Sequence, residues 1–144
     1  MLRILGKISV FGDYDAINKV ASACPIPNHV LLKVGGARKV SNTDAWCYGS
    51  AWYEFHIDEL DIEVQNFLRA HELLATNSPV SIPGIVHAIF TLCPVGQNEE
   101  EIFSCLLTLE TLKILSNLAL DLEIAPASVM PEAIFWTDRI TSDN

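Results

Sequence analysis

Residues 2–11 alternate between apolar and polar side chains, as expected of a half-buried strand. One face carries Leu2, Ile4, Ile8 and Val10, and the opposite face carries Arg3, Lys7 and Ser9. Gly12 ends the strand, and Asp13 is a favourable N-cap. An apolar stripe at helical spacing follows in residues 16–24 and stops before Pro25. The pattern predicts a strand followed by an amphipathic helix.

The clearest alternation covers residues 45–57, which we predict to be one strand. Its odd positions carry Cys47, Ala51, Tyr53, Phe55 and Ile57, and its even positions carry Trp46, Tyr48, Ser50, Trp52, Glu54 and His56. Residues 29–34 before it are a candidate strand, and Gly35-Gly36 permits a hairpin turn from which residues 37–40 would return. A helix from 58 to about 75 follows, with Val64, Phe67, Leu68, His71, Leu74 and Ala75 on one face.

The second half of the chain predicts a strand, a helix and a further strand. Residues 84–93 place Val86, Ala88, Phe90 and Leu92 on one face, and residues 118–124 alternate again. Between them, Thr108 caps a helix whose inward residues are Leu109, Leu112, Leu115 and Leu118. Residues 73–98 lack acidic and basic side chains, but several prolines and glycines interrupt them, so we predict a loop and a buried strand rather than a membrane span.

The order of these elements predicts an α+β fold. The first six match the split βαββαβ, or ferredoxin-like, pattern. One-sided strands suit an antiparallel sheet of 4–5 strands with helices on one face, here with an added helix and strand. We predict one domain at 1–125 and a C-terminal extension at 126–144 that packs on the sheet or is partly disordered.

The polar strand faces assemble into one candidate surface. It would combine Arg3 and Lys7 with Trp46, Tyr48, Trp52, Glu54, His56, His87, Thr91, Asp121 and Glu123. One interpretation is an open binding face, since aromatic residues are enriched at interfaces. The other is a face in which the basic residues pair with Glu54, Asp121 or Glu123 and Phe135 and Trp136 cover the aromatic side chains.

Charge narrows the class of partner. Residues 1–39 hold six of the nine basic residues, whereas 40–144 hold sixteen of the eighteen acidic ones, and the net charge is −9. This surplus disfavours nucleic acid and anionic membranes and favours basic proteins. The acidic clusters are Asp58, Glu59, Asp61 and Glu63 at a helix start and Glu99, Glu100 and Glu101 in a loop. Helix capping and solubility explain most of these clustered acids, but capping does not explain an excess of nine negative charges over the whole chain.

Candidate catalytic and metal-binding patterns are weak. Cys24, Cys47, Cys93 and Cys105 form no CxxC pair, which favours buried reduced thiols in a cytoplasmic protein, and the N-terminus lacks the pattern of a signal peptide. A metal site is conceivable at Glu54, His56 and Asp58, which are spaced two residues apart. Three successive ligands on one strand face rarely converge on a metal, so we favour a solvated polar face and predict no cofactor or metal. His29 and His87 have no nucleophile at a diagnostic spacing, and His71 is interpreted as a boundary histidine with one satisfied nitrogen.

Residues 33–39 form a basic glycine loop with two interpretations. Backbone N–H groups and Lys33, Arg38 and Lys39 would suit an anion. The loop lacks the lysine-serine ending of a P-loop, which favours a hairpin turn with solvated lysines.

Several segments together resemble a bacterial family described as domain of unknown function 4279. They are FGDYDAINKV (11–20), the loop from Lys33 to Gly36, GSAWYEF (49–55) and LTLETLKILSNLALDLEI (107–124). Val34 interrupts the family's usual lysine-glycine pair, and Trp52 stands at the family's tryptophan. The resemblance implies an α+β sandwich and transfers no catalytic residue. Small proteins of this kind also resemble the immunity proteins of bacterial toxin systems, by analogy only.

The sequence therefore favours a non-catalytic, cytoplasmic, acidic binding protein. The specific hypothesis is an immunity protein that neutralises a basic toxin such as a nuclease, with the two acidic clusters as contacts and Trp46 or Tyr48 as an anchor. The alternative is a regulatory domain that binds a small molecule or anion through the open sheet face or the Lys33–Lys39 loop.

Overall fold

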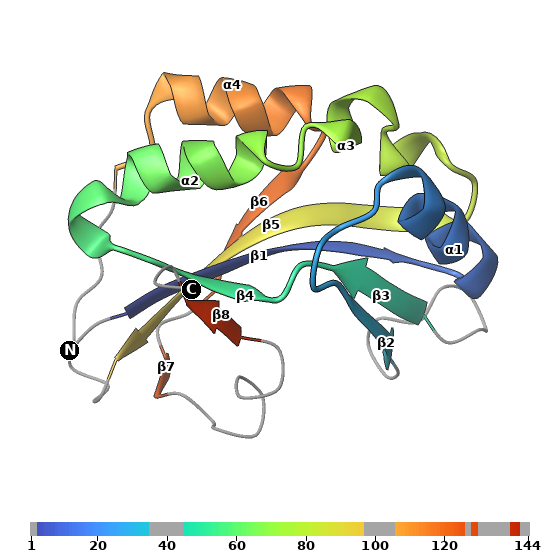
Figure 1. The fold of residues 1–144 in the computed structure, drawn as a ribbon, viewed down its shortest axis with the longest axis horizontal. Helices are drawn as coiled ribbons and strands as arrows, with labels where there is room; N and C mark the ends of the chain where they lie inside the picture. Colours follow the sequence, from blue (N-terminus) through green and yellow to red (C-terminus); the bar gives the residue numbers. More distant parts are fainter. Residues whose placement is uncertain (1–2, 35–44, 97–105, 126–127, 130–138, 142–144) are drawn as a thin grey trace.

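The computed structural model describes residues 3–34, 45–96, 106–125, 128–129 and 139–141 (Figure 1). The strands are β1 (Arg3–Gly12), β2 (Val30–Val34), β3 (Ala45–Gly49), β4 (Trp52–Phe55), β5 (Ile85–Gly96), β6 (Asp121–Ile124), β7 (Ser128–Val129) and β8 (Arg139–Thr141). The helices are α1 (Tyr14–Ala23), α2 (Leu60–Arg69), α3 (Leu73–Thr76) and α4 (Leu109–Asn117), with short 3-10 turns η2 (Ile57–Glu59) and η3 (Pro79–Ser81).

β1 is the central strand of one mostly antiparallel sheet. It pairs antiparallel with β3 and β4 on one side and with β5 on the other. β2 pairs antiparallel with β3, and β6, β7 and β8 add parallel pairings at the outer sides of β5 and β4. The predicted class, an α+β fold built on a mostly antiparallel sheet, is confirmed, but the predicted count of 4–5 strands is too low, because the short strands β6, β7 and β8 extend the sheet by parallel pairing.

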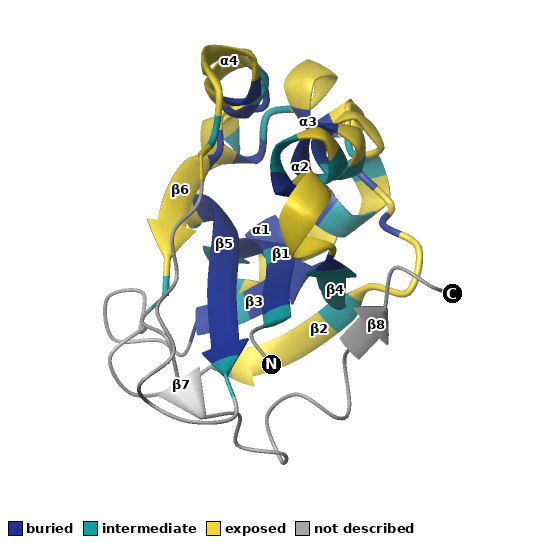
Figure 2. Cartoon of the chain, turned by 90° about the vertical axis from the view of Figure 1, so that its left-hand side faces the viewer, coloured by how far each residue is buried: buried dark blue, intermediate teal, exposed yellow. Residues whose placement is uncertain are grey.

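The helices lie over one face of this sheet and enclose the main core (Figures 1 and 2). The apolar face predicted for the first strand is confirmed, because Ile4, Ile8 and Val10 are buried there. Their partners come from all three long helices and from β5, namely Ile17, Val20, Val64, Leu68, Ala88, Phe90, Leu92 and Leu115. The predicted N-cap is also confirmed, since Asp13 Oδ1 accepts a 2.8 Å hydrogen bond from the N–H of Ala16.

A bulge divides the predicted strand 45–57 into β3 and β4. β1 pairs Gly6 with Tyr53 and Val10 with Tyr48, so four steps along β1 face five steps on its partner. Gly49 permits the close approach, because a Cβ there would lie 2.0 Å from the carbonyl oxygen of Ile8. The extra residue shifts the alternation, so that Trp46 and Tyr48 lie on the helix face, whereas Trp52 does not.

The placement of Trp46 and Tyr48 on the polar face was therefore wrong. Tyr48 is 1% exposed and belongs to the main core. Its hydroxyl donates to the carbonyl of Cys24 at 2.9 Å and accepts from the N–H of Ile26 at 2.8 Å. Trp46 is half-buried, packs against the core and contacts the ring of Tyr14. Tyr48 is consequently unsuited to anchor a partner.

The inward face of α4 also differs from the prediction. Leu115 and Leu118 are buried, but Leu109 is 68% exposed and Leu112 is exposed too. A repeat of three residues falls about 60° short of a full helical turn at each step. Four leucines at that spacing therefore sweep around half the helix, and the buried position in the first turn is taken by Thr111.

The helix predicted at 58–75 is interrupted after Arg69. The N–H of His71 bonds to Leu68, while the Nδ1–H of its own ring donates to the carbonyl of Phe67 at 2.8 Å. In a continuing α-helix that carbonyl would accept from the backbone N–H of His71. The imidazole takes its place, and the chain restarts as α3. The interpretation of His71 as a boundary histidine with one satisfied nitrogen is confirmed.

The second face of the sheet carries a smaller cluster and several polar pairs. Leu5, Cys93 and Val95 are buried there, with Trp52 and Ala125 packed against them. Arg3 pairs with Glu54, and the Lys7 ammonium lies 5.0 Å from the centre of the Trp52 ring. At the β5–β6 side, Thr91 Oγ1 donates to Glu123 at 3.1 Å and His87 lies 3.9 Å from Asp121. The pairing of Arg3 with Glu54 was expected from the alternation.

Two short parts of the predicted C-terminal extension join the sheet, as β7 beside β5 and β8 beside β4. Phe135 and Trp136 lie outside the described residues, so their covering role stays a prediction. The division at residue 125 likewise stays a prediction. Among the described helices, none has the length and apolar character needed to cross a membrane.

Candidate protein-interaction surface

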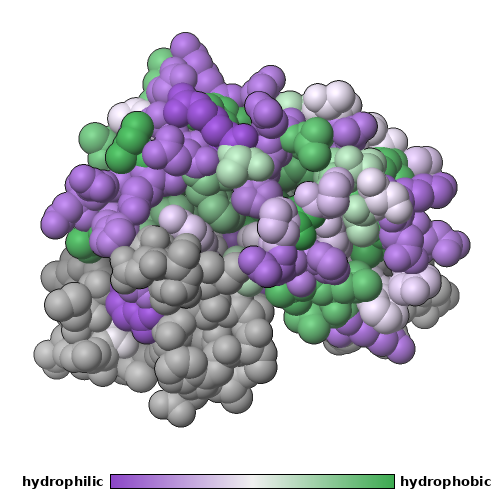
Figure 3. Space-filling model, in the orientation of Figure 1, coloured by the Kyte–Doolittle hydropathy of each residue, from purple (hydrophilic) through white to green (hydrophobic). Residues whose placement is uncertain are grey.

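An open hollow of about 470 Å³ lies at the start of α2. Three of its lining residues are exposed hydrophobic side chains, Ile57, Ile62 and Leu106, of which Leu106 is 77% exposed. Asp58 and Glu59 are exposed beside them. We refer to these five residues as the α2-start surface. Figure 3 shows the same mixture of green hydrophobic and purple hydrophilic side chains over the helical layer.

The acidic side chains of the α2-start surface have no basic neighbour in the described part of the chain. Asp58 and Glu59 form no ion pair there, whereas Glu54 pairs with Arg3 and Glu110 with Arg69. Among the described residues that line the hollow, none is a lysine or arginine. The negative potential of these two carboxylates is thus uncompensated locally, which favours a cationic group from a partner.

Asp61 also lines the hollow, but its carboxylate is hydrogen-bonded within the fold. Its carboxylate accepts hydrogen bonds at 2.6–3.1 Å from both the N–H and the hydroxyl of Thr108, the hydroxyl of Thr111 and the amide of Gln65. Desolvation alone would raise the pKa of Asp61, but the hydrogen bonds from Thr111, Thr108 and Gln65 outweigh it and hold the pKa below its ordinary value. Asp61 therefore caps α4 from a neighbouring helix.

Glu63 is also committed to an internal contact. Its carboxylate accepts from the backbone N–H of His56 at 2.6 Å and lies 2.7 Å from His56 Nδ1. This contact fixes the chain where β4 passes into η2. Of the four acids predicted at this helix start, Asp58 and Glu59 are exposed to solvent. Asp61 and Glu63 instead form hydrogen bonds within the fold.

Other predicted site residues are placed apart or not described. Glu99, Glu100, Glu101, Arg38 and Lys39 lie outside the described residues, so the second acidic cluster and the anion loop stay predictions. Lys33 is exposed on β2, at the far side of the sheet from β5. Trp46 lies on β3, next to β2, and not beside the hollow.

The residues considered for metal binding do not converge in the structure. Glu54 pairs with Arg3 and His56 with Glu63, while Asp58 faces solvent. In the described ranges, no group of three metal-ligating side chains occurs. Cys24, Cys47 and Cys93 are buried, and burial raises the pKa of the Cys24 thiol. Cys105 lies outside the described residues.

The sequence patterns missed the hydrophobic part of the α2-start surface. Ile57 was placed in the strand 45–57, but β4 ends at Phe55 and Ile57 opens η2. Ile62 lies off the stripe formed by Val64, Phe67 and Leu68. An apolar residue on the polar side of an amphipathic helix is the signal that would have identified it.

Comparison with known proteins gives no match: no protein-family model fits the sequence, and no curated protein or solved structure is significantly similar to it. The resemblance to domain of unknown function 4279 therefore stays a prediction.

Proposed function

We propose that this chain is a non-catalytic, acidic binding protein that contacts a basic protein through the α2-start surface. The observation that carries the proposal is the uncompensated pair Asp58 and Glu59 next to exposed Ile57, Ile62 and Leu106. Protein interfaces combine such a hydrophobic centre with a polar rim. Isolated exposed apolar residues are ordinary, but three around one hollow are a reason to expect a partner.

The chemistry of the surface specifies the partner. Its carboxylates would accelerate encounter with a positively charged surface, and its hydrophobic side chains would then bury apolar area and slow dissociation. A lysine or arginine with an apolar stem fits both requirements, because its stem packs on hydrophobic groups while its head meets a carboxylate.

The specific form of this proposal is an immunity protein for a basic toxin such as a nuclease, acting in the cytoplasm. A nuclease needs a cationic surface to hold phosphate groups, and an acidic protein competes for that surface. The net charge of −9 supports this assignment. The alternative, a regulatory domain that binds an anion at Lys33, Arg38 and Lys39, stays a prediction because most of that loop is undescribed.

The direct test measures binding to the product of an adjacent toxin gene by calorimetry at low salt. The wild-type chain should bind at submicromolar concentration, and its coexpression should protect cells from the toxin. Ile62→Ser should weaken binding by about 10-fold, equivalent to about 1.4 kcal/mol. Leu73→Ser is the matched control, since Leu73 is a comparably exposed helical residue outside the hollow, and it should leave Kd within about 2-fold.

Two results would overturn the proposal. The first is no binding at micromolar concentration in low salt, together with no protection of cells. The second is equal weakening by Ile62→Ser and Leu73→Ser, which would mean that the contact lies elsewhere or that both variants merely perturb the fold. Urea unfolding of both variants separates these explanations.

We further infer that the first six major elements form a split βαββαβ, ferredoxin-like unit, with β3 and β4 together as its third strand. The support is the pairing order β2, β3 with β4, β1, β5, in which every neighbouring pair is antiparallel. In this unit the α2-start surface lies directly after the third strand, where the chain leaves the sheet.

A further inference from the structure

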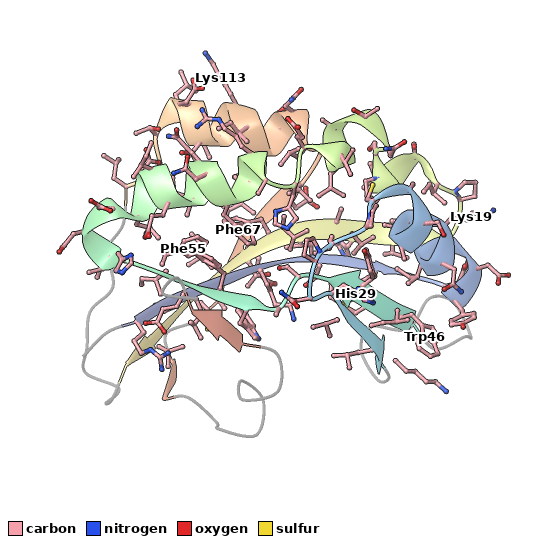
Figure 4. All side chains as sticks on the ribbon, viewed as in Figure 1. Lys19, His29, Trp46, Phe55, Phe67 and Lys113 are labelled. Atoms are coloured by element: carbon pink, nitrogen blue, oxygen red, sulfur yellow. The ribbon has the colours of Figure 1, made fainter. Side chains whose placement is uncertain are left out.

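A second cavity, of about 260 Å³, lies at the opposite end of α2. Its apolar walls come from the loop after α1 through Pro27, from the bulge through Ala51, and from the rings of Tyr53 and Phe67. Figure 4 shows Phe67 pointing from α2 toward the sheet, which places its ring between the two layers. None of the described residues lining the cavity is charged.

His71 supplies an acceptor in this cavity. The carbonyl of Phe67 can only accept, so the Nδ1 atom that contacts it at 2.8 Å carries the ring hydrogen. The Nε2 atom then presents a lone pair, and in the described part of the chain it has no hydrogen-bond partner. Burial lowers the pKa of His71 more than the Phe67 carbonyl raises it, so the imidazole is neutral at neutral pH.

Ser50 supplies a donor in the same cavity. This residue is 5% exposed, and its Oγ accepts a 3.0 Å hydrogen bond from the N–H of Ile8. The backbone N–H of Ser50 donates to the carbonyl of Ile8, also at 3.0 Å. The hydroxyl hydrogen of Ser50 has no acceptor among the described residues. A buried donor without a partner costs roughly 1–3 kcal/mol, so a ligand group that accepts from it gains stabilisation.

We propose that this cavity binds a small, uncharged cyclic molecule that donates a hydrogen bond to His71 Nε2 and accepts one from the Ser50 hydroxyl. The apolar walls would hold the ring, and the two polar groups would fix its orientation. A cyclic amide or a phenol carries both a hydrogen-bond donor and an acceptor on a small ring, so it could pair with both of these groups. The site is separate from the α2-start surface and does not depend on the function proposed for it.

Size and charge restrict the ligand further. Pockets for drug-sized molecules occupy roughly 300–1,000 Å³, so a cavity of about 260 Å³ selects a smaller molecule. A charged ligand would lose its hydration without gaining a counter-ion from the lining residues. The expected occupant is therefore a single ring with one polar edge.

The experiment titrates the intact chain with 2-pyridone, which is neutral and carries an N–H donor beside a carbonyl acceptor. Chemical-shift changes and calorimetry should give a Kd of about 0.1–1 mM, as expected of so small a ligand. Toluene, which matches 2-pyridone in size but lacks polar groups, and benzoate, which is charged, should each bind at least about 10-fold more weakly. His71→Phe keeps a ring and removes the acceptor, and it should weaken 2-pyridone binding by about 10-fold.

Ala70→Phe provides a test that spares the core. Ala70 lines the cavity and is exposed, so a ring at this position should block entry and abolish binding. Ala75→Phe is the matched control, because Ala75 is exposed on α3 and does not line the cavity, and it should bind like the wild type. The proposal is overturned if 2-pyridone does not bind below about 10 mM, in which case water alone satisfies the two groups. It is also overturned if Ala70→Phe binds as well as Ala75→Phe.

Discussion

Replacing Asp61 by asparagine should destabilise the chain, because the carboxylate is the acceptor that joins α2 to α4. Oδ1 accepts from the Thr108 N–H and the Thr111 hydroxyl, and Oδ2 accepts from the Thr108 hydroxyl and Gln65 Nε2. An asparagine keeps one of these oxygens and presents an NH₂ group in place of the other. At least one donor that now meets oxygen would meet another donor.

The structure sets the size of this effect. Thr111 is fully buried and Gln65 nearly so, so a hydrogen-bond donor left without an acceptor there pays its desolvation cost. A hydrogen bond to a charged group is worth about 1.5–3 kcal/mol, and a buried unsatisfied donor costs about 1–3 kcal/mol. The two costs together span about 2.5–6 kcal/mol, and because Asp61 itself is partly exposed we expect the lower end, a loss of about 2.5–3 kcal/mol in the free energy of unfolding at pH 7.

The pH dependence gives an independent check. The pKa of Asp61 is lower in the folded chain than its ordinary value of about 3.9, so its contribution to stability is complete above that value. The contribution is lost as the pH falls through the folded-state pKa. The gap in unfolding free energy between the wild type and Asp61→Asn should therefore narrow between about pH 5 and pH 2.

Urea unfolding followed by circular dichroism measures both quantities. Asp58→Asn is the control, since this neighbouring exposed aspartate pairs with no described residue and its replacement should change stability by less than about 0.5 kcal/mol. If Asp61→Asn behaves like Asp58→Asn at pH 7, the interhelical cap does not stabilise the fold. A gap that widens on acidification would contradict the sign of the pKa argument.

Two substitutions and one labelling experiment probe the bulge and the core. Gly49→Ala should lower the free energy of unfolding by about 3 kcal/mol or more, because the new Cβ would lie 2.0 Å from the carbonyl oxygen of Ile8. An unchanged urea midpoint would refute the close contact between Gly49 and this carbonyl. Tyr48→Phe should cost about 2–3 kcal/mol, because it leaves the buried carbonyl of Cys24 and N–H of Ile26 unpaired; calorimetric unfolding checks this, and a loss under 0.5 kcal/mol would mean that water replaces the hydroxyl. Cys24 should label with iodoacetamide only on unfolding, as peptide mapping would show, because burial raises the pKa of its thiol; rapid labelling of the native chain would contradict this placement.

The sequence predicted the elements whose hydrophobic period is uninterrupted. Of the face predicted for β5, Ala88, Phe90 and Leu92 are buried, but Val86 is exposed, because the pairing of β5 with β1 shifts register between Phe11 and Gly12. The face of β1 followed directly from alternation, and Asp13 identified the start of α1 from the chemistry of its side chain. These features are local, so the pattern within a few residues determines them.

The prediction failed where a tertiary contact changes the period. One extra residue between Gly49 and Tyr53 exchanges the two faces of the strand, and period-two reasoning across it put Trp46 and Tyr48 on the wrong side. A glycine within an otherwise regular strand was the available signal. The roles of Asp61 and Glu63 were also out of reach, because they depend on Thr108 and His56, whose proximity only the folded chain establishes.

The most direct test of the α2-start surface compares two charge-matched double variants in calorimetric binding to the basic partner. Asp58→Asn with Glu59→Gln removes both exposed carboxylates of the surface, whereas Asp15→Asn with Glu72→Gln removes two exposed carboxylates elsewhere. We expect Kd to rise about 10-fold or more at low salt for the first variant and under about 3-fold for the second, and the difference should shrink as salt screens the charges. Equal effects of the two variants would show that only net charge matters and would contradict a defined contact at the start of α2.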